Sequence, residues 1–574
     1  MMAKNHSHRT TRSTKPSAVL STITLLLLVG CNGSSSPTES NANNVDNNNS
    51  DGDKVQKVVP SAFNLTGMNA VDGKAKTLNV AWSDSQDATG YVLCRNDAGS
   101  CTPLTEVISG TQAEVDLTPQ LMKASDDYYV VAKNSKHGTE TASNESPLPT
   151  EDFKKMVGYF KSPDPDQNDM FGAVGDISLD GKTMLVGAQM EDSGDPSDPT
   201  NNAKNNSGAA YILKYANSVW SLAHYLKPPA HQIKDGTKFG AKVTLSDSGN
   251  TAAVSSEDYI YIFENGIEKA SFAYNWPSFP RVPDIALAGD GNTLFAFGVN
   301  SNSVDVYERS SQGQWSKSGT ITNPDTHNPA QAANDLFGFE LATNRVGDRV
   351  LIAAPHEDSN SEGVNSDSAN DLMRDAGAAY VFEKVNGTWQ QHAYIKPSVI
   401  GSVKTFASTV YMHPTQDYLV IGAIDRSNAT GINGDASDTS MQWSGAAYLF
   451  APHPTNSYQQ VAYIKSPKSN DWNEYSQGLG MNESADILAV SEPDDGTGNE
   501  GSIHLYSVSP DHSVNYLEEI TAPNGDTNDW FGGFIAFSRD SMLTGSSSEA
   551  SNSNTNQQGQ DNNSLDGAGA AYLF

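Results

Sequence analysis

The chain has 574 residues and a formal net charge of −32, with 68 acidic against 36 basic residues. A surface this acidic repels the phosphates of nucleic acids and of anionic lipids, which excludes nucleic-acid binding and favours cations, basic partners or a salty medium. Solubility at high ionic strength explains the same charge without any partner, and composition does not decide between the two interpretations.

The N-terminal segment predicts export. Residues 1–30 combine basic residues with an apolar run from Ala18 to Val29, which is too short to span a bilayer and is typical of a signal peptide. Leu28-Val29-Gly30-Cys31 resembles the lipobox of bacterial lipoproteins, which implies lipidation of Cys31; the alternative is an ordinary signal peptide with a chance cysteine. Asn32 stands where that family often carries an inner-membrane retention aspartate, so the resemblance implies an outer-membrane lipoprotein of the cell envelope.

Residues 31–56 are rich in Asn, Ser, Asp and Gly and predict a disordered tether. If Cys31 carries lipid, Cys94 and Cys101 remain as a pair around a plausible turn. An exported protein meets an oxidising environment, so we expect a disulfide between them.

Residues 57–150 predict a small β-domain. Three segments alternate like half-buried strands: 78–82, 90–94 and 128–132. The pattern resembles a fibronectin type III domain, which implies that Trp82 packs under Tyr91 and that a later tyrosine forms a corner near Leu117. Tyr128 and Tyr129 both fit that corner, and the sequence leaves the choice open.

From about residue 156 to residue 574 the sequence repeats. A Gly-Ala-Ala-Tyr-type strand occurs at Gly208, Gly377, Gly445 and Gly569, with degenerate copies at Asp258, Asn302 and Gly501, at intervals of 44 to 75 residues. A second motif, Phe-Gly, recurs upstream of these strands, with clear copies that begin at Phe171, Phe239, Phe337 and Phe531. Weaker copies hold other pairs in the same place: Phe406-Ala407, Ser476-Gln477 and Pro283-Asp284. A unit of about 44 residues is the length of a four-stranded propeller blade.

These motifs resemble the FG-GAP repeat of integrin α-chain propellers and of bacterial surface proteins. The resemblance covers about 420 residues and implies an all-β chain, in which a fibronectin III-like β-sandwich precedes a seven-bladed β-propeller over residues 156–574. We expect the repeated residues to form core, and we expect residues 157–163 to supply the outer strand of the last blade, because they match the fourth strand of other blades.

The calcium loops of integrin repeats are missing. The turns between the first two strands, such as Leu179-Asp180-Gly181, hold too few oxygen ligands for a dedicated Ca²⁺ cage and predict hairpin turns instead. Calcium is the one cofactor for which the sequence offers ligands, and the best local cluster for a weak site is Asp425, Asp435 and Asp438.

Candidate binding residues gather in the loops that follow second strands, which emerge on one face of a propeller. They are Glu191, Asp192, Glu357, Asp358, Asp425, Trp443, Asp494 and Asp495. The alternative is that the acids bond local backbone in turns and that Trp443 only packs its own loop.

No Gly-x-Ser-x-Gly, His-Glu-x-x-His or phosphate-binding loop occurs, so the sequence predicts that the chain is not an enzyme. The favoured function is that of a lipid-anchored envelope protein whose propeller binds or adheres to a protein or glycan. The alternatives are a carbohydrate-active enzyme, a glycosidase or lyase, on the propeller scaffold, and a structural envelope protein without a specific small ligand.

Overall fold

The structure is a computed structural model that describes residues 57–574, except 72–75, 98, 118–126, 218, 275–281, 299–301, 326–333, 402–403, 495–497, 554–559 and 561. The described part is all-β, as the sequence predicts, and its one α-helix is α1 (Thr150–Met156). No helix in this part is both long and apolar enough for a membrane span. The expected signal peptide, Cys31 and the tether lie outside the described residues.

The small domain consists of two antiparallel sheets. One contains β1 (Leu65–Ala70), β2 (Thr77–Trp82) and β5 (Gln112–Asp116). The other contains β3 (Gly90–Asp97), β4 (Ser100–Pro103), β6 (Asp127–Asn134), β7 (Thr139–Ala142) and β8 (Ser146–Pro147).

Trp82 packs against Tyr91 with 5.6 Å between the ring centroids, the contact that the sequence predicts. Of the two candidate corner tyrosines, Tyr128 is fully buried and Tyr129 is half-buried. The expected disulfide between Cys94 and Cys101 is confirmed, and it joins the neighbouring strands β3 and β4.

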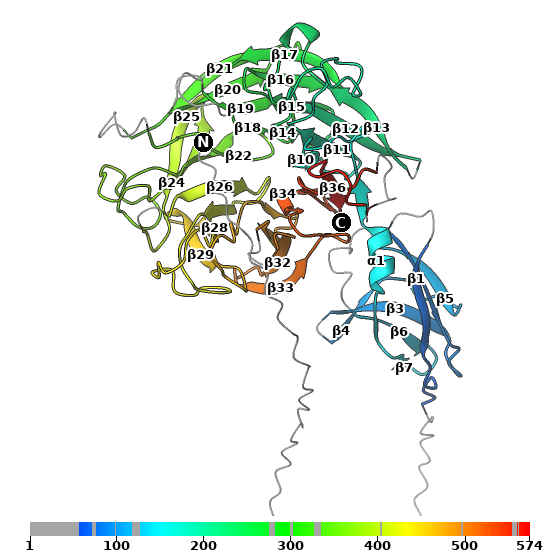
Figure 1. The fold of residues 1–574 in the computed structure, drawn as a ribbon. Helices are drawn as coiled ribbons and strands as arrows, with labels where there is room; N and C mark the ends of the chain where they lie inside the picture. Colours follow the sequence, from blue (N-terminus) through cyan, green and yellow to red (C-terminus); the bar gives the residue numbers. More distant parts are fainter. Residues whose placement is uncertain are drawn as a thin grey trace, which may run out of the picture. The chain divides into compact units, whose positions relative to one another are not determined.

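Seven four-stranded antiparallel sheets follow in the described residues, an arrangement consistent with a β-propeller (Figure 1). Sheet 1 holds β10 (Val174–Ile177), β11 (Thr183–Ala188), β12 (Ala209–Ala216) and β13 (Val219–Leu226), and the short 3₁₀ turn η2 (Ala230–Gln232) follows it. Sheet 2 holds β14 (Lys242–Leu245), β15 (Thr251–Ser255), β16 (Tyr259–Glu264) and β17 (Ile267–Ala273). Sheet 3 holds β18 (Ile285–Leu287), β19 (Thr293–Phe297), β20 (Ser303–Arg309) and β21 (Trp315–Thr322). Sheet 4 holds β22 (Leu341–Thr343), β23 (Arg349–Ala354), β24 (Ala378–Val385) and β25 (Thr388–Ile395). Sheet 5 holds β26 (Phe406–Met412), β27 (Leu419–Ala423), β28 (Ala446–His453) and β29 (Ser457–Ile464). Sheet 6 holds β30 (Leu479–Met481), β31 (Ile487–Glu492), β32 (Ser502–Val508) and β33 (Val514–Ile520). Sheet 7 holds β34 (Phe531–Phe537), β35 (Met542–Ser546), β36 (Ala570–Leu573) and β9 (Gly158–Phe160).

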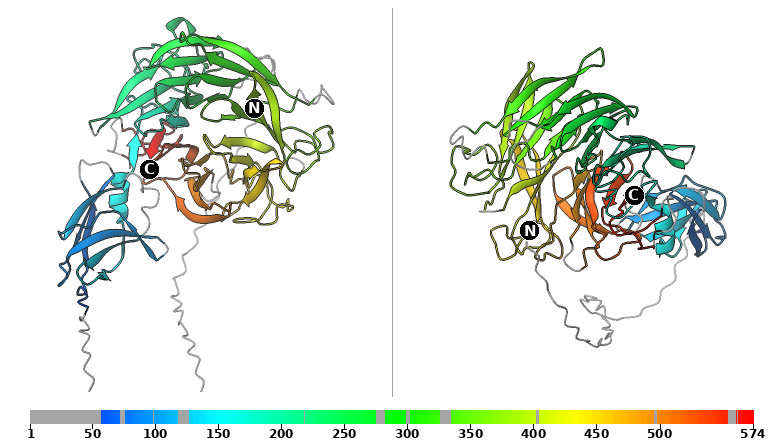
Figure 2. Two further views of the ribbon diagram at one scale, coloured as in Figure 1. Left: turned by 180° about the vertical axis from the view of Figure 1, so that it is seen from behind. Right: turned by 45° about the horizontal axis from the view of Figure 1, so that its top comes forward.

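The first strand of each sheet is the inner one. It contacts the first strand of the next sheet, and β34 of sheet 7 contacts β10 of sheet 1. Sheet 7 takes its fourth strand from the segment that precedes sheet 1, drawn in cyan beside the red C-terminal strand in Figure 2. This strand, β9, pairs antiparallel with β36 and sets Tyr159 opposite Tyr572. The expectation that residues 157–163 complete the last sheet is therefore confirmed.

The hydrophobic core of this array lies between neighbouring sheets. One cluster joins Leu351 and Val381 of sheet 4 to Leu419 and Ile421 of sheet 5, and another joins Leu543 and its neighbours in sheet 7 to the strands of sheet 1. Burying each large apolar side chain contributes roughly 1.5–3 kcal/mol. Each sheet buries its two faces only because the next sheet covers them, as repeat proteins require.

Aromatic pairs mark the repeat. The Phe of each clear Phe-Gly copy packs edge-to-face on the Tyr two strands later, with centroid distances of 5.3 to 5.4 Å: Phe171–Tyr211, Phe239–Tyr261, Phe337–Tyr380 and Phe531–Tyr572. In sheet 6 the position of this Phe belongs to Tyr475 and the glycine position to Ser476 (φ 85°), one residue earlier than the sequence pattern predicts.

Glycine is required where neighbouring sheets meet. Gly377 has a φ of 80°, and a Cβ there would lie 2.1 Å from the carbonyl oxygen of Phe406 in the next sheet. Gly569 of sheet 7 makes the same approach, 2.1 Å, to Phe171 of sheet 1. The Gly-Ala-Ala-Tyr motif is therefore the point at which one backbone touches the next.

This contact predicts the effect of Gly377→Ala. Its matched control is Gly363→Ala, because Gly363 has almost the same φ, 79°, but open space around the position of a Cβ. Both substitutions strain the backbone, and only the first forces two sheets apart, so we expect it to lower the free energy of unfolding by about 1–3 kcal/mol more than the control. Chemical denaturation of the two variants measures this difference, and equal losses would show that the close approach does not matter.

Candidate functional site

Two of the predicted binding residues are buried inside the fold. Glu191 accepts hydrogen bonds from Tyr225 Oη and from Lys227 Nζ, both at 2.7 Å. Glu357 repeats the arrangement with Tyr394 and Lys396, at 2.8 and 2.7 Å. In sheets 1 and 4 the Tyr and Lys at the end of the fourth strand thus hold the carboxylate that follows the second strand, an arrangement called here the clamp. A buried, paired carboxylate of this kind does not face a ligand.

The same clamp recurs where the array closes. Glu549 of sheet 7 is held by Tyr159 at 2.9 Å and by Lys161 at 2.7 Å, and both come from the segment that carries β9. Glu549 is not among the binding residues predicted from the sequence, although it stands three residues after the second strand of its sheet, as Glu191 and Glu357 do.

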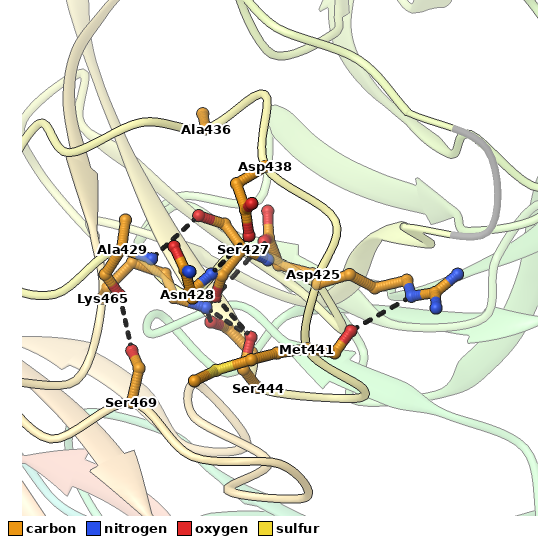
Figure 3. Close-up of polar contacts among 12 residues, drawn as sticks. Asp425, Ser427, Asn428, Ala429, Ala436, Asp438, Met441, Ser444, Lys465 and Ser469 are labelled. Carbon is orange, nitrogen blue, oxygen red and sulfur yellow. Dashed lines mark hydrogen bonds and ion pairs between the residues drawn. The ribbon is translucent and has the colours of Figure 1, made fainter.

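Asp425 lies in the loop after the second strand of sheet 5, two residues beyond β27 (Figure 3). It is fully buried. Its oxygens lie 3.4 Å from Lys404 Nζ and 3.8 Å from Lys465 Nζ, and Tyr448 donates a hydrogen bond at 3.1 Å. Two lysines therefore occupy the space in which a cation would have to sit beside this carboxylate.

The other two members of the expected calcium cluster cap turns. Asp435 accepts hydrogen bonds from the backbone and hydroxyl of Ser437, and Asp438 does the same for Ser440. Asp438 also accepts a hydrogen bond from the backbone N–H of Asn428 (Figure 3). Within the described part of the chain, no group of three His, Cys, Asp or Glu side chains could hold a metal ion.

Asp192 and Asp358 also bond local backbone. Asp192 accepts from the N–H of Asn206 and Asp358 from that of Asp375, each at 2.7 Å. Asp494 is half-buried, and Asp495 lies outside the described residues. Of the predicted candidates that the structure describes, Trp443 alone is both exposed, at 45%, and part of the lining of a cavity.

That cavity has a volume of about 430 Å³, within the range of small-molecule sites. Inner strands of several sheets, and the residues next to them, converge on it. Its lining residues include Lys242, Glu340, Ser408, Thr409, Trp443, Glu474, Tyr475, Ser476, Gln477 and Gly533. Because inner strands from different sheets meet here, side chains that are far apart in the sequence face one space.

An ion network crosses one side of the cavity. Lys242 Nζ lies 3.0 Å from Asp284 and 2.9 Å from Glu340, so it joins sheets 2, 3 and 4. Burial, followed by the charge of Glu340, raises the pKa of Asp284 to about 7, although Lys242 opposes the shift. Lys242 is thus the positive centre between two acids, and its charge is neutralised within the protein.

Glu474 lies on another side of the cavity, just before Tyr475. Burial and the negative charge of Asp494 raise the pKa of its carboxyl group, and a hydrogen bond from Gln477 offsets part of this rise. A carboxyl group with a raised pKa keeps its proton to higher pH and is suited to donate it.

Sequence reasoning missed Lys242, Glu340 and Glu474. A signal was present, because Lys242 and Glu340 both stand three residues after the Phe of a Phe-Gly pair, where Val174 and Phe534 stand in sheets 1 and 7. A charge at an inner-strand position that sheets 1 and 7 fill with apolar residues marks the side of the strand that faces the cavity.

Buried aspartates before the Phe-Gly pairs form a second recurring feature. Burial and a nearby glutamate raise the pKa of Asp169 to about 8, of Asp335 to about 8 and of Asp529 to about 7. The nearby glutamates are Glu191, Glu357 and Glu549, the carboxylates of the three clamps. Each buried aspartate therefore lies beside a group of the same charge.

No family model matches the chain, and no curated protein matches it. Among solved structures, the chain is similar to a periplasmic gluconolactonase of Pseudomonas aeruginosa, with 11% identity and a TM-score of 0.40, covering 76% of this chain and 97% of that one. It is also similar to a candidate 6-phosphogluconolactonase of Bacteroides uniformis, with 13% identity and a TM-score of 0.39, covering 76% of this chain and 97% of that one. The hydrazine synthase of Kuenenia stuttgartiensis shares 9% identity at a TM-score of 0.40, covering 67% of this chain and 93% of that one.

These comparisons correct three expectations from the sequence: the FG-GAP, integrin-like identification, the adhesive function drawn from it, and the absence of enzyme activity. No FG-GAP model matches, and the similar structures carry the names of a gluconolactonase, a candidate 6-phosphogluconolactonase and a hydrazine synthase. The physical reason is that Phe-Gly and Gly-Ala-Ala-Tyr mark contacts between packed sheets, which do not specify one family. At TM-scores of 0.38 to 0.40, however, the likeness carries no argument about which reaction this chain performs.

The buried aspartates predict a pH dependence of stability. Because the pKa of Asp335 is raised to about 8, the folded chain keeps a proton that the unfolded chain releases near pH 4. The resulting stabilisation is complete below about pH 4 and is lost as the pH rises through about 8. Asp335→Asn keeps one acceptor oxygen for Asn323 and removes the titration.

We therefore expect the urea midpoint of Asp335→Asn, relative to wild type, to increase between pH 6 and pH 9. Asp290→Asn, at an exposed turn, controls for the loss of one negative charge. A difference between Asp335→Asn and wild type that stays constant over this range would contradict the prediction.

Proposed function

We propose that the chain is a carbohydrate-active hydrolase whose reaction takes place in the cavity lined by Lys242, Glu340 and Glu474. The observation that carries the proposal is the convergence of these charged groups, from sheets 2, 4 and 6, on one cavity of about 430 Å³. Hydrolysis at a sugar carbon needs an acid and a base in different environments, which two such carboxyl groups supply.

Each group has a distinct role in this proposal. Glu474 gives its proton to the leaving oxygen, because its pKa is raised. Glu340, whose Oε1 accepts a hydrogen bond from Lys242 at 2.9 Å, is the carboxylate that accepts a proton from the attacking water. Lys242 is a positioning residue that orients Glu340.

We also infer that sheets 1–7 are the blades of one closed seven-bladed propeller, and that residues 57–150 form a fibronectin III-like domain. The successive contacts of the inner strands, from β10 round to β34, support the ring. The two sheets of the small domain and the packing of Trp82 on Tyr91 support the sandwich.

Glu474→Gln tests the catalytic proposal. The purified chain and the variant are assayed against oligosaccharides, p-nitrophenyl glycosides and a sugar lactone. We expect the variant to lose about 100-fold or more in kcat on oligosaccharides, whose leaving oxygen needs a proton, and to lose less on p-nitrophenyl glycosides, whose leaving group departs without one. The decline of wild-type activity at high pH, where Glu474 loses its proton, should disappear from the residual rate. Glu106→Gln, an exposed carboxyl group of the small domain, is the control and should keep full activity. Wild-type kcat in Glu474→Gln, or no turnover of any of these substrates by the wild type, would refute the proposal.

The location of the chain is a separate proposal that rests on the sequence. We infer that it is an envelope lipoprotein anchored through Cys31, because a lipobox-like segment follows the apolar run. Cys31→Ser removes the sulfur that would carry lipid, so the chain should move from the membrane pellet to the soluble fraction. A variant that stays in the pellet after a salt wash would contradict the anchor.

A further inference from the structure

Two exposed tryptophans lie side by side at the cavity. Trp443 follows the insertion of sheet 5 and Trp472 belongs to the loop that enters sheet 6. Their ring centroids are 5.3 Å apart and their planes are tilted by 30°, and the two residues remain 45% and 49% exposed. Large apolar side chains packed together at a surface, beside a cavity, indicate a binding surface.

Both tryptophans occupy strained backbone positions, with φ of 55° at Trp443 and 68° at Trp472. Such left-handed conformations suit Gly, Asn and Asp and disfavour bulky residues. The repeats provide an internal comparison. The position of Trp443 holds Asn206, Asp375, Asn499 and Gly567 in other sheets, and the position of Trp472 holds Asn168, Gly236 and Asn528, all with positive φ.

The chain thus carries tryptophan at two positions where sibling sheets carry Asn, Asp or Gly, which adopt the left-handed conformation at lower cost. Left-handed conformations of this kind cost on the order of 1–3 kcal/mol each and cluster at ligand sites. Core packing does not explain the exchange, because about half of each residue is exposed. Contact of the two rings with a ligand does explain why tryptophan stands at these positions.

Hydrogen bonds hold the pair in place before any ligand arrives. The backbone N–H of Trp472 donates to the carbonyl of Gln442 at 2.8 Å, and the backbone N–H of Gln442 donates to Oδ1 of Asp471 at 2.8 Å. Glu474 N–H donates to the carbonyl of Trp443 at 3.2 Å. The backbone therefore ties the platform directly to the proposed acid, and a preorganised site loses less entropy on binding.

The charges around the cavity select the kind of ligand. Glu340 and Glu474 line it, and the positive charge of Lys242, the only Lys or Arg among the described lining residues, is taken up by Asp284 and Glu340. With a formal net charge of −32 on the chain, an anionic sugar would be repelled. A neutral sugar ring, which presents C–H groups on one face, fits the electron-rich face of an indole.

We propose that Trp443 and Trp472 form a stacking platform that binds a neutral oligosaccharide and guides one of its ring units into the cavity. The inference rests on the proposed function, for which it names the substrate class. Phosphorylated sugars and uronic acids are excluded as substrates, and the sugar bound at the platform lies next to the unit that reacts.

Trp443→Asn and Trp472→Asn test the platform, because asparagine is the residue that sibling sheets carry at these positions. Electrophoresis of the purified chain through gels that contain laminarin, starch or galactomannan, compared with alginate or polygalacturonate, measures binding without any need for turnover. We expect at least one neutral polysaccharide, and neither anionic one, to retard the wild type. Each variant should bind that polysaccharide about tenfold more weakly or worse.

Thermal unfolding separates a binding role from a structural one. If the tryptophans serve a ligand, the Tm of each asparagine variant should be unchanged or higher, because strain is relieved. Leu372→Asn, which removes another exposed apolar side chain from sheet 4, is the control and should bind like wild type.

Four outcomes would overturn the platform: no binding to the neutral polysaccharides, stronger binding to alginate or polygalacturonate, wild-type binding by the asparagine variants, or a Tm lowered by several degrees. Glu474→Gln should still bind. Tryptophan-dependent binding by a chain that turns over none of the assayed substrates would refute the hydrolase and leave the platform standing.

Discussion

The close approach between neighbouring sheets is the constraint on which the rest of this structure depends. A glycine with positive φ brings the start of a third strand against the backbone of the next sheet, as Gly377 does at Phe406 and Gly569 does at Phe171. The Phe at that contact then packs on the Tyr of its own sheet. Because the same contact joins sheet 7 to sheet 1, it also aligns the inner strands that line the cavity.

Buried charge is the second organising feature. In sheets 1, 4 and 7 a carboxylate after the second strand is held by a Tyr and a Lys of the fourth strand, and a buried aspartate with a raised pKa lies near it. Such clusters stabilise the fold only while each charge is paired, since an unpaired buried charge is costly. They also explain why so acidic a chain folds: part of its acid is internal, and some of it holds a proton at neutral pH.

The candidate site differs from these clusters in how its groups are arranged. The carboxylates of the clamps are matched by lysine and tyrosine, whereas Glu474 faces the cavity with a raised pKa and the tryptophans beside it are strained and exposed. Departures from the residues that a repeat usually carries tend to gather where function lies. Here Trp443 and the charged inner-strand residues Lys242 and Glu340 line one cavity, and Trp472 packs against Trp443 beside it.

The sequence by itself determined the all-β class, the four-strand repeat, the closing strand at residues 158–160 and the disulfide. These follow from local patterns, because strand alternation, Gly and Pro punctuation and cysteine spacing act over a few residues. The site was decided by tertiary structure alone. Whether an acid after a strand is buried against a lysine, as Glu357 is, or faces a cavity, as Glu474 does, depends on which side chains distant strands bring to it. Residue type does not carry that information. Glu191 and Glu357, which the sequence selected for binding, are therefore buried against Tyr and Lys, and Asp192 and Asp358 bond local backbone, whereas the cavity lies where inner strands of separate sheets converge.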